Sequence, residues 1–138
     1  MGVVKVLRSD LIYPELSYQI VGCAFDVFNK LGPGHSEKVY QQAMAEAMRI
    51  KGIIFAEQAY YNVKFNEKVV GKSFFDFEVD GKIIVELKKD ERFSKTHIDQ
   101  VVDYLKKSEL KLSIIINFTK EGVKYKRLIN VSESPNHP

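Results

Sequence analysis

The sequence predicts an α/β (α+β) fold in which a central mixed β-sheet is flanked by helices, and two patterns support this prediction. Apolar residues recur at helical spacing in three separate segments. Five further runs are rich in β-branched and aromatic residues, which is typical of strands. In chain order the elements are ααβββαββ. Because a helix separates the third strand from the fourth, we expect a right-handed crossover and a parallel pair there.

Two helices come first. Apolar side chains at every third or fourth position predict a helix over residues 14–31, with Pro14 in its first turn and Gly32 at its end. Ser36 can cap a second helix, which we expect to run to about residue 51.

The remaining elements follow from alternation and from turn residues. Asp80-Gly81 is a strong hairpin signal between two extended runs. The nearly all-apolar run 112–118 is typical of a strand buried on both faces. We expect strands over 54–65, 69–79 and 82–88, a helix over 94–107, and strands over 112–118 and 123–131.

Length and composition limit the classes of protein. The 138 residues suit one domain, which we expect over 1–131, with 132–138 as a disordered tail. Cys23 is the only cysteine, which excludes an intramolecular disulfide and a cysteine-based zinc site. No apolar run approaches the roughly 20 residues of a membrane helix, and residues 1–10 lack the pattern of a signal peptide. We therefore expect a cytoplasmic protein. The net charge of +3 is weak evidence for a nucleic-acid partner.

Two carboxylates are predicted to meet on the sheet. Alternation along strand 69–79 places Phe75 and Phe77 on one face and Asp76 on the other. Glu86 and Lys88 share a face of the next strand, and the hairpin pairs the two strands. Asp76 and Glu86 can therefore lie together, and burying such charges costs several kcal/mol per ion unless a partner compensates.

A divalent metal is the obvious partner. Oxygen donors without paired His or Cys favour Mg²⁺ or Mn²⁺ over zinc. We expect Asp76, Glu86 and the backbone carbonyl of Leu87 to hold the metal, with Lys88 beside it. Such a metal acidifies a water and neutralises charge on a phosphoryl oxygen. Taken alone, the Glu-x-Lys tripeptide is more often a solvated pair.

Four other residues strengthen the site. Glu37 lies in the first turn of the second helix, on its otherwise apolar face, where its ordinary role is to favour the helix dipole. His97, Gln100 and Tyr104 form a stripe along the third helix, which is also what the polar edge of an amphipathic helix looks like. Each residue has a structural explanation, but the four together favour a functional site.

The chain resembles a known family. Its segment 34–40 matches the GxxExxY signature, and proteins with this signature are placed in the PD-(D/E)XK nuclease superfamily. The resemblance covers about residues 11–131. It implies that Glu37 is the acidic residue of the helix, Asp76 the metal-binding aspartate, and Glu86-Leu87-Lys88 the (D/E)-x-K element. It also implies that Gln100 and Tyr104 are the helix motif of the recombination-exonuclease branch, with His97 beside them. Phe75, not proline, precedes Asp76.

These observations predict a Mg²⁺-dependent nuclease, with DNA a more favoured substrate than RNA. Asp76 and Glu86 would bind the metal, Glu37 would contribute a ligand directly or through water, and Lys88 would position the nucleophile. Gln100 and Tyr104 would support the site, while His97 and Lys89 would contact substrate. A homodimer or larger complex would enlarge the binding surface. Two alternatives stay open: a module that binds nucleic acid or protein without cutting, and a metal-dependent hydrolase of a small phosphorylated substrate. The basic residues that could contact phosphate are Lys89, Arg92, Lys95, Lys124, Lys126 and Arg127.

Overall fold

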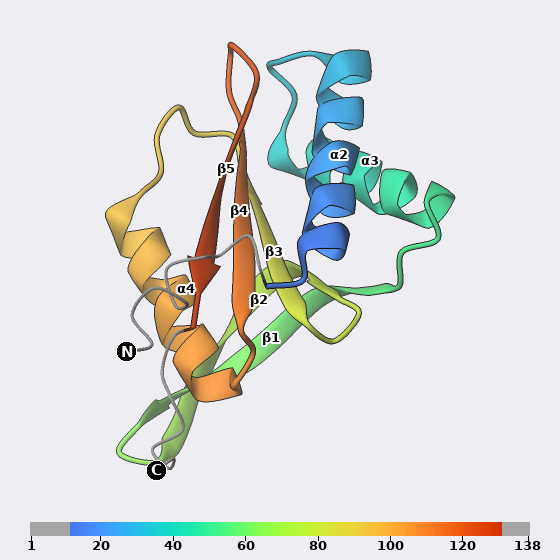
Figure 1. The fold of residues 1–138 in the computed structure, drawn as a ribbon. Coiled ribbons are helices and arrows are strands. Elements are labelled where there is room, and N and C mark those ends of the chain that lie inside the picture. The colour runs from blue at the N-terminus through green and yellow to red at the C-terminus, as the bar shows by residue number, and fades with distance from the viewer. Residues whose placement is uncertain (1–11, 131–138) are drawn as a thin grey trace, which may run out of the picture.

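A five-stranded mixed sheet carries two helices on one face and one helix on the other in the computed structural model, which describes residues 12–130 (Figure 1). The predicted order ααβββαββ is confirmed. Residues 1–11 and 131–138 lie outside the described residues, and these include the predicted tail, 132–138, and the last residue of the predicted strand 123–131. The elements are α2 (Pro14–Leu31), α3 (Glu37–Ile50), β1 (Phe55–Phe65), β2 (Lys68–Val79), β3 (Ile83–Lys88), α4 (Lys95–Ser108), β4 (Leu112–Phe118) and β5 (Val123–Ile129).

The strands lie in the order in which they occur in the chain, β1-β2-β3-β4-β5. Three of the four neighbouring pairs are antiparallel, as short connections allow. The pair β3–β4 is parallel, because α4 carries the chain back along one face of the sheet. The parallel pair expected from the sequence is therefore present.

Two apolar cores lie on opposite faces of the sheet. One contains buried residues of α2 and α3, among them Ile20, Met44 and Met48, packed on the sheet. The other joins Val101 and Tyr104 of α4 to the opposite face. Because every residue of β4 is buried, that strand contributes to both cores, which explains its nearly all-apolar sequence.

The ends of the helices follow the capping residues. Pro14 is the first residue of α2, and Gly32 ends it with φ 74°, where its N–H donates to the Phe28 carbonyl. Ser36 caps α3, because its hydroxyl accepts a hydrogen bond from the Val39 N–H at 3.2 Å.

The sheet forks between β2 and β3. Their ladder consists of only three residue pairs next to the turn, and its last pair joins Phe77 to Val85. Beyond that pair β2 continues alongside β1, while β3 continues alongside β4. Figure 1 shows the β1–β2 hairpin extending away from the other strands. The fork frees backbone groups of both strands, and two of them, the N–H groups of Asp76 and Leu87, donate to carboxylates next to it.

The expectation that Phe75 and Phe77 share a face is wrong. Phe75 packs with Tyr104 in the α4-side core, whereas Phe77 lies in the core under α2 and α3. Alternation is interrupted between them, at Asp76. Opposite it the β1–β2 ladder lacks a pair, and Gln58 has φ 56°, a backbone conformation that regular strands do not use.

Candidate active site

Asp76 and Glu86 lie on either side of the fork and are joined by backbone hydrogen bonds. The Asp76 N–H donates to Glu86 Oε1 at 2.9 Å. The Leu87 N–H donates to Asp76 Oδ2 at 2.7 Å. Each carboxylate therefore accepts from a backbone donor of the opposite strand where the ladder has ended. The structure brings these two predicted residues together.

The surroundings of Asp76 disfavour its charge. Burial, and next the neighbouring charge of Glu86, raise the pKa of the Asp76 carboxyl to about 7, although the Leu87 N–H opposes the shift. Glu37 adds a smaller contribution in the same direction. Glu86 itself is 8% exposed. A pair of close, poorly solvated carboxylates is an oxygen donor set that suits a hard divalent cation, since the cation would favour both ionised forms.

The fit to Mg²⁺ or Mn²⁺ rests on this pair. Within residues 12–130 no group of three His, Cys, Asp or Glu side chains is arranged to hold a metal. The other ligand positions would thus fall to carbonyl, water or phosphate oxygens, as is usual for Mg²⁺. Leu87 contributes an N–H to Asp76 and a buried side chain to the core. Its carbonyl as a ligand remains a prediction.

Glu37 is held near the pair by the start of α3. It is exposed, and its charge reaches Asp76. Tyr40, one turn further, is buried, stacks on Phe118 with ring centroids 4.2 Å apart, and donates from its hydroxyl to the Gly32 carbonyl at 2.7 Å. Tyr40 therefore fixes the loop that leads to Glu37, and its role is structural.

His97 lies beside Glu86 on the α4 side. Its Nε2 is 3.3 Å from Glu86 Oε2, and both side chains are largely buried. Ser94 caps α4 by accepting from the His97 N–H at 3.2 Å, which fixes the first turn of the helix. A hydrogen-bonding group this close can orient the Glu86 carboxylate. The expected contact of His97 with substrate stays a prediction.

The other two residues of the α4 stripe have different surroundings. Gln100 is exposed, and its side chain has no hydrogen bond to the described part of the chain. Tyr104 is buried against Phe75 and Tyr61, with ring centroids 4.8 Å away in both cases. Burial, with the charge of Glu78 next, raises the pKa of the Tyr104 phenol, so its hydroxyl stays protonated. Tyr104 packs α4 against the strand that carries Asp76.

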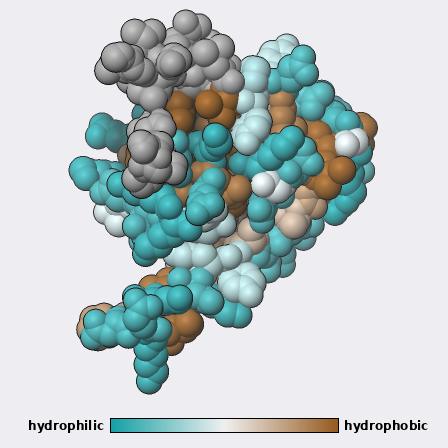
Figure 2. Space-filling view, turned by 60° about the horizontal axis from the view of Figure 1, so that its bottom comes forward, coloured by the Kyte–Doolittle hydropathy of each residue, from teal (hydrophilic) through white to brown (hydrophobic). Residues whose placement is uncertain are grey.

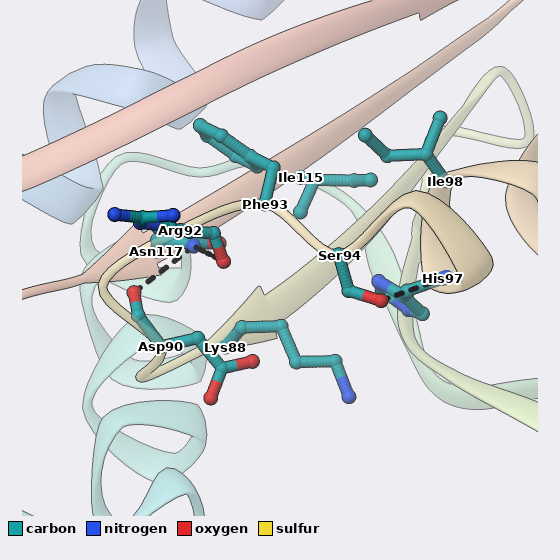
Figure 3. Close-up of a pocket in the computed structure, with 9 residues that line it drawn as sticks. All are labelled: Lys88, Asp90, Arg92, Phe93, Ser94, His97, Ile98, Ile115 and Asn117. Atoms are coloured by element: carbon teal, nitrogen blue, oxygen red, sulfur yellow. Dashed lines mark hydrogen bonds between the residues drawn. The ribbon is translucent and has the colours of Figure 1, made fainter.

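Lys88 lines a small cavity beside His97 (Figure 3). The cavity has a volume of about 10 Å³, enough for about one water molecule. Within residues 12–130 no carboxylate pairs with the Lys88 ammonium. The next residue, Lys89, has an exposed side chain. The residues that line the cavity are Lys88, Asp90, Arg92, Phe93, Ser94, His97, Ile98, Ile115 and Asn117.

Sequence reasoning missed Asn117. Its Nδ2 donates to the carbonyls of Asp90 at 3.0 Å and Arg92 at 3.2 Å, so it fixes the loop between β3 and α4 (Figure 3). Asn117 also pairs with Lys88 in the β3–β4 register. Its buried Oδ1 has no hydrogen-bond partner in the described part of the chain. The available signal was the one amide side chain in a strand whose other residues, apart from Ser113, are apolar.

A second, larger hollow adjoins Asp76 and was also not predicted. Its volume is about 260 Å³, and it lies between α3 and the β1–β2 hairpin. Gln41 follows Glu37 by one helical turn, which is a spacing that could have suggested it. The lining residues are Gln41, Gln58, Phe74, Phe75 and Asp76.

Comparison with known proteins supplies the family. A model of the PD-(D/E)XK nuclease superfamily matches residues 14–128, which include the fork and the whole of α4. The chain belongs to the PD-(D/E)XK nuclease superfamily. Most members of this superfamily are nucleases, and they typically use divalent metals. Between residues 12 and 130, no helix is long and apolar enough to cross a membrane.

The fold of this superfamily member is also similar to a crystal structure of SSO0001. The two share 13% sequence identity with a TM-score of 0.54, over 95% of this chain and 64% of that one. The chain thus spans less than two thirds of SSO0001, and the similarity shows the fold alone. A search of curated proteins finds no significant match.

Proposed function

We propose that this protein is a divalent-metal-dependent nuclease that hydrolyses phosphodiester bonds in nucleic acid, with DNA as the proposed substrate. Mg²⁺ is the proposed metal, and Mn²⁺ can substitute for it. The observation that carries the proposal is the pair formed by Asp76 and Glu86 at the fork, with Lys88 two residues further along β3. Membership of a superfamily made up mostly of nucleases supports the same reaction.

The chemistry divides among few residues. A divalent metal, when bound, stabilises negative charge that develops on the oxygens of the scissile phosphate. Asp76 and Glu86 hold that metal, and Glu37 assists directly or through water. Lys88, whose ammonium has no carboxylate partner within residues 12–130, orients the attacking water or stabilises the transition state. His97 fixes the orientation of Glu86.

The remaining predicted residues act around this centre. Gln100, exposed on α4, contacts a substrate phosphate, and Lys89 adds positive charge next to the site. Tyr104 supports the strand that carries Asp76. We also infer that the chain belongs to the GxxExxY family, because segment 34–40 carries the signature. The Tyr40 hydroxyl of that segment accepts from the His35 N–H and donates to the Gly32 carbonyl just before it.

We propose a cytoplasmic location and a possible assembly for this nuclease. Cys23 is a buried free thiol in α2, which suits the reducing cytoplasm. A homodimer or larger complex would give so small a domain more surface for recognising nucleic acid. Gel filtration with light scattering, with and without an oligonucleotide, tests that assembly.

The deciding experiment is a titration with Mg²⁺ and Mn²⁺ that follows both metal binding and cleavage of single- and double-stranded DNA and RNA. Wild-type protein should cut only with metal, and Asp76→Asn should abolish cutting. Glu78→Gln is the matched control, because Glu78 lies two residues along the same strand but outside the fork. Metal binding without cutting of any nucleic acid would contradict the nuclease, and absence of metal binding would favour the binding module. Equal loss in Glu78→Gln would show a general effect of charge.

A further inference from the structure

Two exposed aromatic rings lie side by side on the hairpin next to the fork. Tyr60 of β1 pairs with Phe74 of β2, and their ring centroids are 5.9 Å apart. They are 52% and 57% exposed, respectively. The rings of Tyr61 and Phe75 stack on each other, face the other way and are covered by α4. Packing of the core therefore explains one aromatic pair and leaves the other facing solvent.

The exposed pair adjoins the candidate active site. Phe74 and Asp76 line the same hollow of about 260 Å³, together with Phe75, Gln41 and Gln58. A ligand group packed on the Phe74 ring would thus lie next to the Asp76 carboxylate, which is proposed to bind metal. The two amide side chains provide donors and acceptors in the same hollow.

The charge of the hairpin is positive. Between Tyr60 and Phe74 the chain has three lysines and one glutamate. The Lys72 ammonium is 4.4 Å from the centroid of the Tyr60 ring. In Figure 2 brown, apolar surface interrupts the teal surface of the projecting end of the molecule. Aromatic rings with nearby cations suit a ligand that has flat rings and a negatively charged backbone.

We propose that Tyr60 and Phe74 form a stacking surface for the unpaired bases of single-stranded nucleic acid. This inference rests on the proposed nuclease function and adds its substrate class. Stacking on Phe74 would hold an unpaired base while the adjoining phosphate lies at Asp76. Base pairs in a duplex hide the faces that such a surface recognises. The surface accepts any base, since every base has an aromatic face.

Binding measured without cleavage tests this proposal. Fluorescence anisotropy of a labelled oligothymidylate and of a labelled hairpin duplex would be recorded in EDTA, and again with Ca²⁺. Phe74→Ala and Tyr60→Ala should each weaken single-strand binding roughly ten-fold and leave duplex binding within about two-fold. Both side chains are more than half exposed, so thermal unfolding should change little.

Phe65→Ala is the matched control. Phe65 is an aromatic residue of β1, the strand that carries Tyr60, and is 68% exposed, but it does not line the hollow beside Asp76. It should leave single-strand affinity within about two-fold, since its ring adjoins no metal site. Equal losses in Phe65→Ala and Phe74→Ala, or none in either, would overturn the stacking surface. Failure of the wild-type protein to bind any oligonucleotide would also overturn it and favour a protein partner.

The two proposals fail in different ways. If the wild-type protein cuts DNA with Mg²⁺ and Phe74→Ala binds single strands normally, the nuclease proposal stands and the stacking surface is overturned. If the wild-type protein binds single strands through Phe74 but cuts with neither metal, the nuclease proposal is overturned and the stacking surface stands as a binding site.

Discussion

The Asp76 N–H donates a 2.9 Å hydrogen bond to the Glu86 carboxylate, where the β2–β3 ladder stops. The Leu87 N–H in turn donates to Asp76 at 2.7 Å. Two carboxylates whose charges repel are thus held together by the backbone of the two strands that diverge. This arrangement orders the oxygen ligands before a cation arrives, which lowers the entropy cost of binding it.

Asp76→Asn should stabilise the metal-free protein. An asparagine oxygen can still accept from the Leu87 N–H, while the charge that burial and Glu86 oppose is removed. We expect the free energy of unfolding to rise by about 1–3 kcal/mol at about pH 8. Urea denaturation in EDTA measures it, with Glu78→Gln as the control. A loss of stability would mean that the carboxylate is structural.

The stabilising effect of Asp76→Asn should depend on pH. The Asp76 pKa is about 7 in the folded protein, above its ordinary value of 3.8, so the folded state binds more protons between these values. Its contribution to stability is therefore complete below about pH 4, falls as pH rises toward about 7, and is constant above that. The difference between variant and wild type in EDTA should grow over this range. A difference that is flat with pH would contradict the raised pKa.

The sequence allowed the fold and the carboxylate pair to be predicted because both depend on local periods. The helix between β3 and β4 required a parallel pair, and the Asp80-Gly81 hairpin brought Asp76 opposite Glu86. The faces beyond the fork could not be predicted in this way. Phe75 turns toward α4 because the β1–β2 ladder is interrupted opposite Asp76, and a pattern with a period of two contains no sign of that interruption.

The same interruption explains what was missed at the site. With Phe75 on the α4 side, Tyr104 is covered by its ring and packs the helix, although its spacing placed it with polar residues. Gln41 comes from α3 to a hollow beside Asp76. Residues brought together from opposite faces of a forked sheet leave no joint pattern along the chain.

His97→Gln should weaken metal binding while leaving the fold intact. Glutamine keeps a donor, but it does not reproduce the rigid imidazole that lies 3.3 Å from Glu86 Oε2. We expect the Mg²⁺ concentration for half-maximal cleavage to rise roughly ten-fold, with a smaller change in the rate at saturation. Lys95→Ala on the same helix turn, where an exposed pair with Asp99 is lost, should change neither. A normal Mg²⁺ dependence in His97→Gln would remove the residue from the metal site.

Glu37→Gln should be milder than Asp76→Asn. Glu37 is exposed at the first residue of α3 and acts on Asp76 through its charge. We expect cleavage at saturating Mg²⁺ to fall by roughly ten-fold or less, as suits a ligand that acts through water. Glu46→Gln, an exposed carboxylate further along α3, is the control and should be silent. Loss as complete as in Asp76→Asn would instead make Glu37 a direct ligand.

Lys88→Ala should separate catalysis from metal binding. The Lys88 side chain lines the small cavity beside His97, and no carboxylate within residues 12–130 neutralises it, so its charge is free to act on a phosphate or a water. We expect cleavage to fall by roughly a hundred-fold or more with little change in metal affinity, because the two carboxylates remain.

Lys89→Ala is the matched control for Lys88→Ala. The Lys89 side chain is exposed one residue away, and its loss should raise KM for the nucleic acid rather than lower kcat. If Lys89→Ala lowers kcat as much as Lys88→Ala, the two lysines serve only as positive charge near the substrate. If Lys88→Ala unfolds the protein, its role is structural, and guanidinium unfolding of both variants in EDTA distinguishes that result.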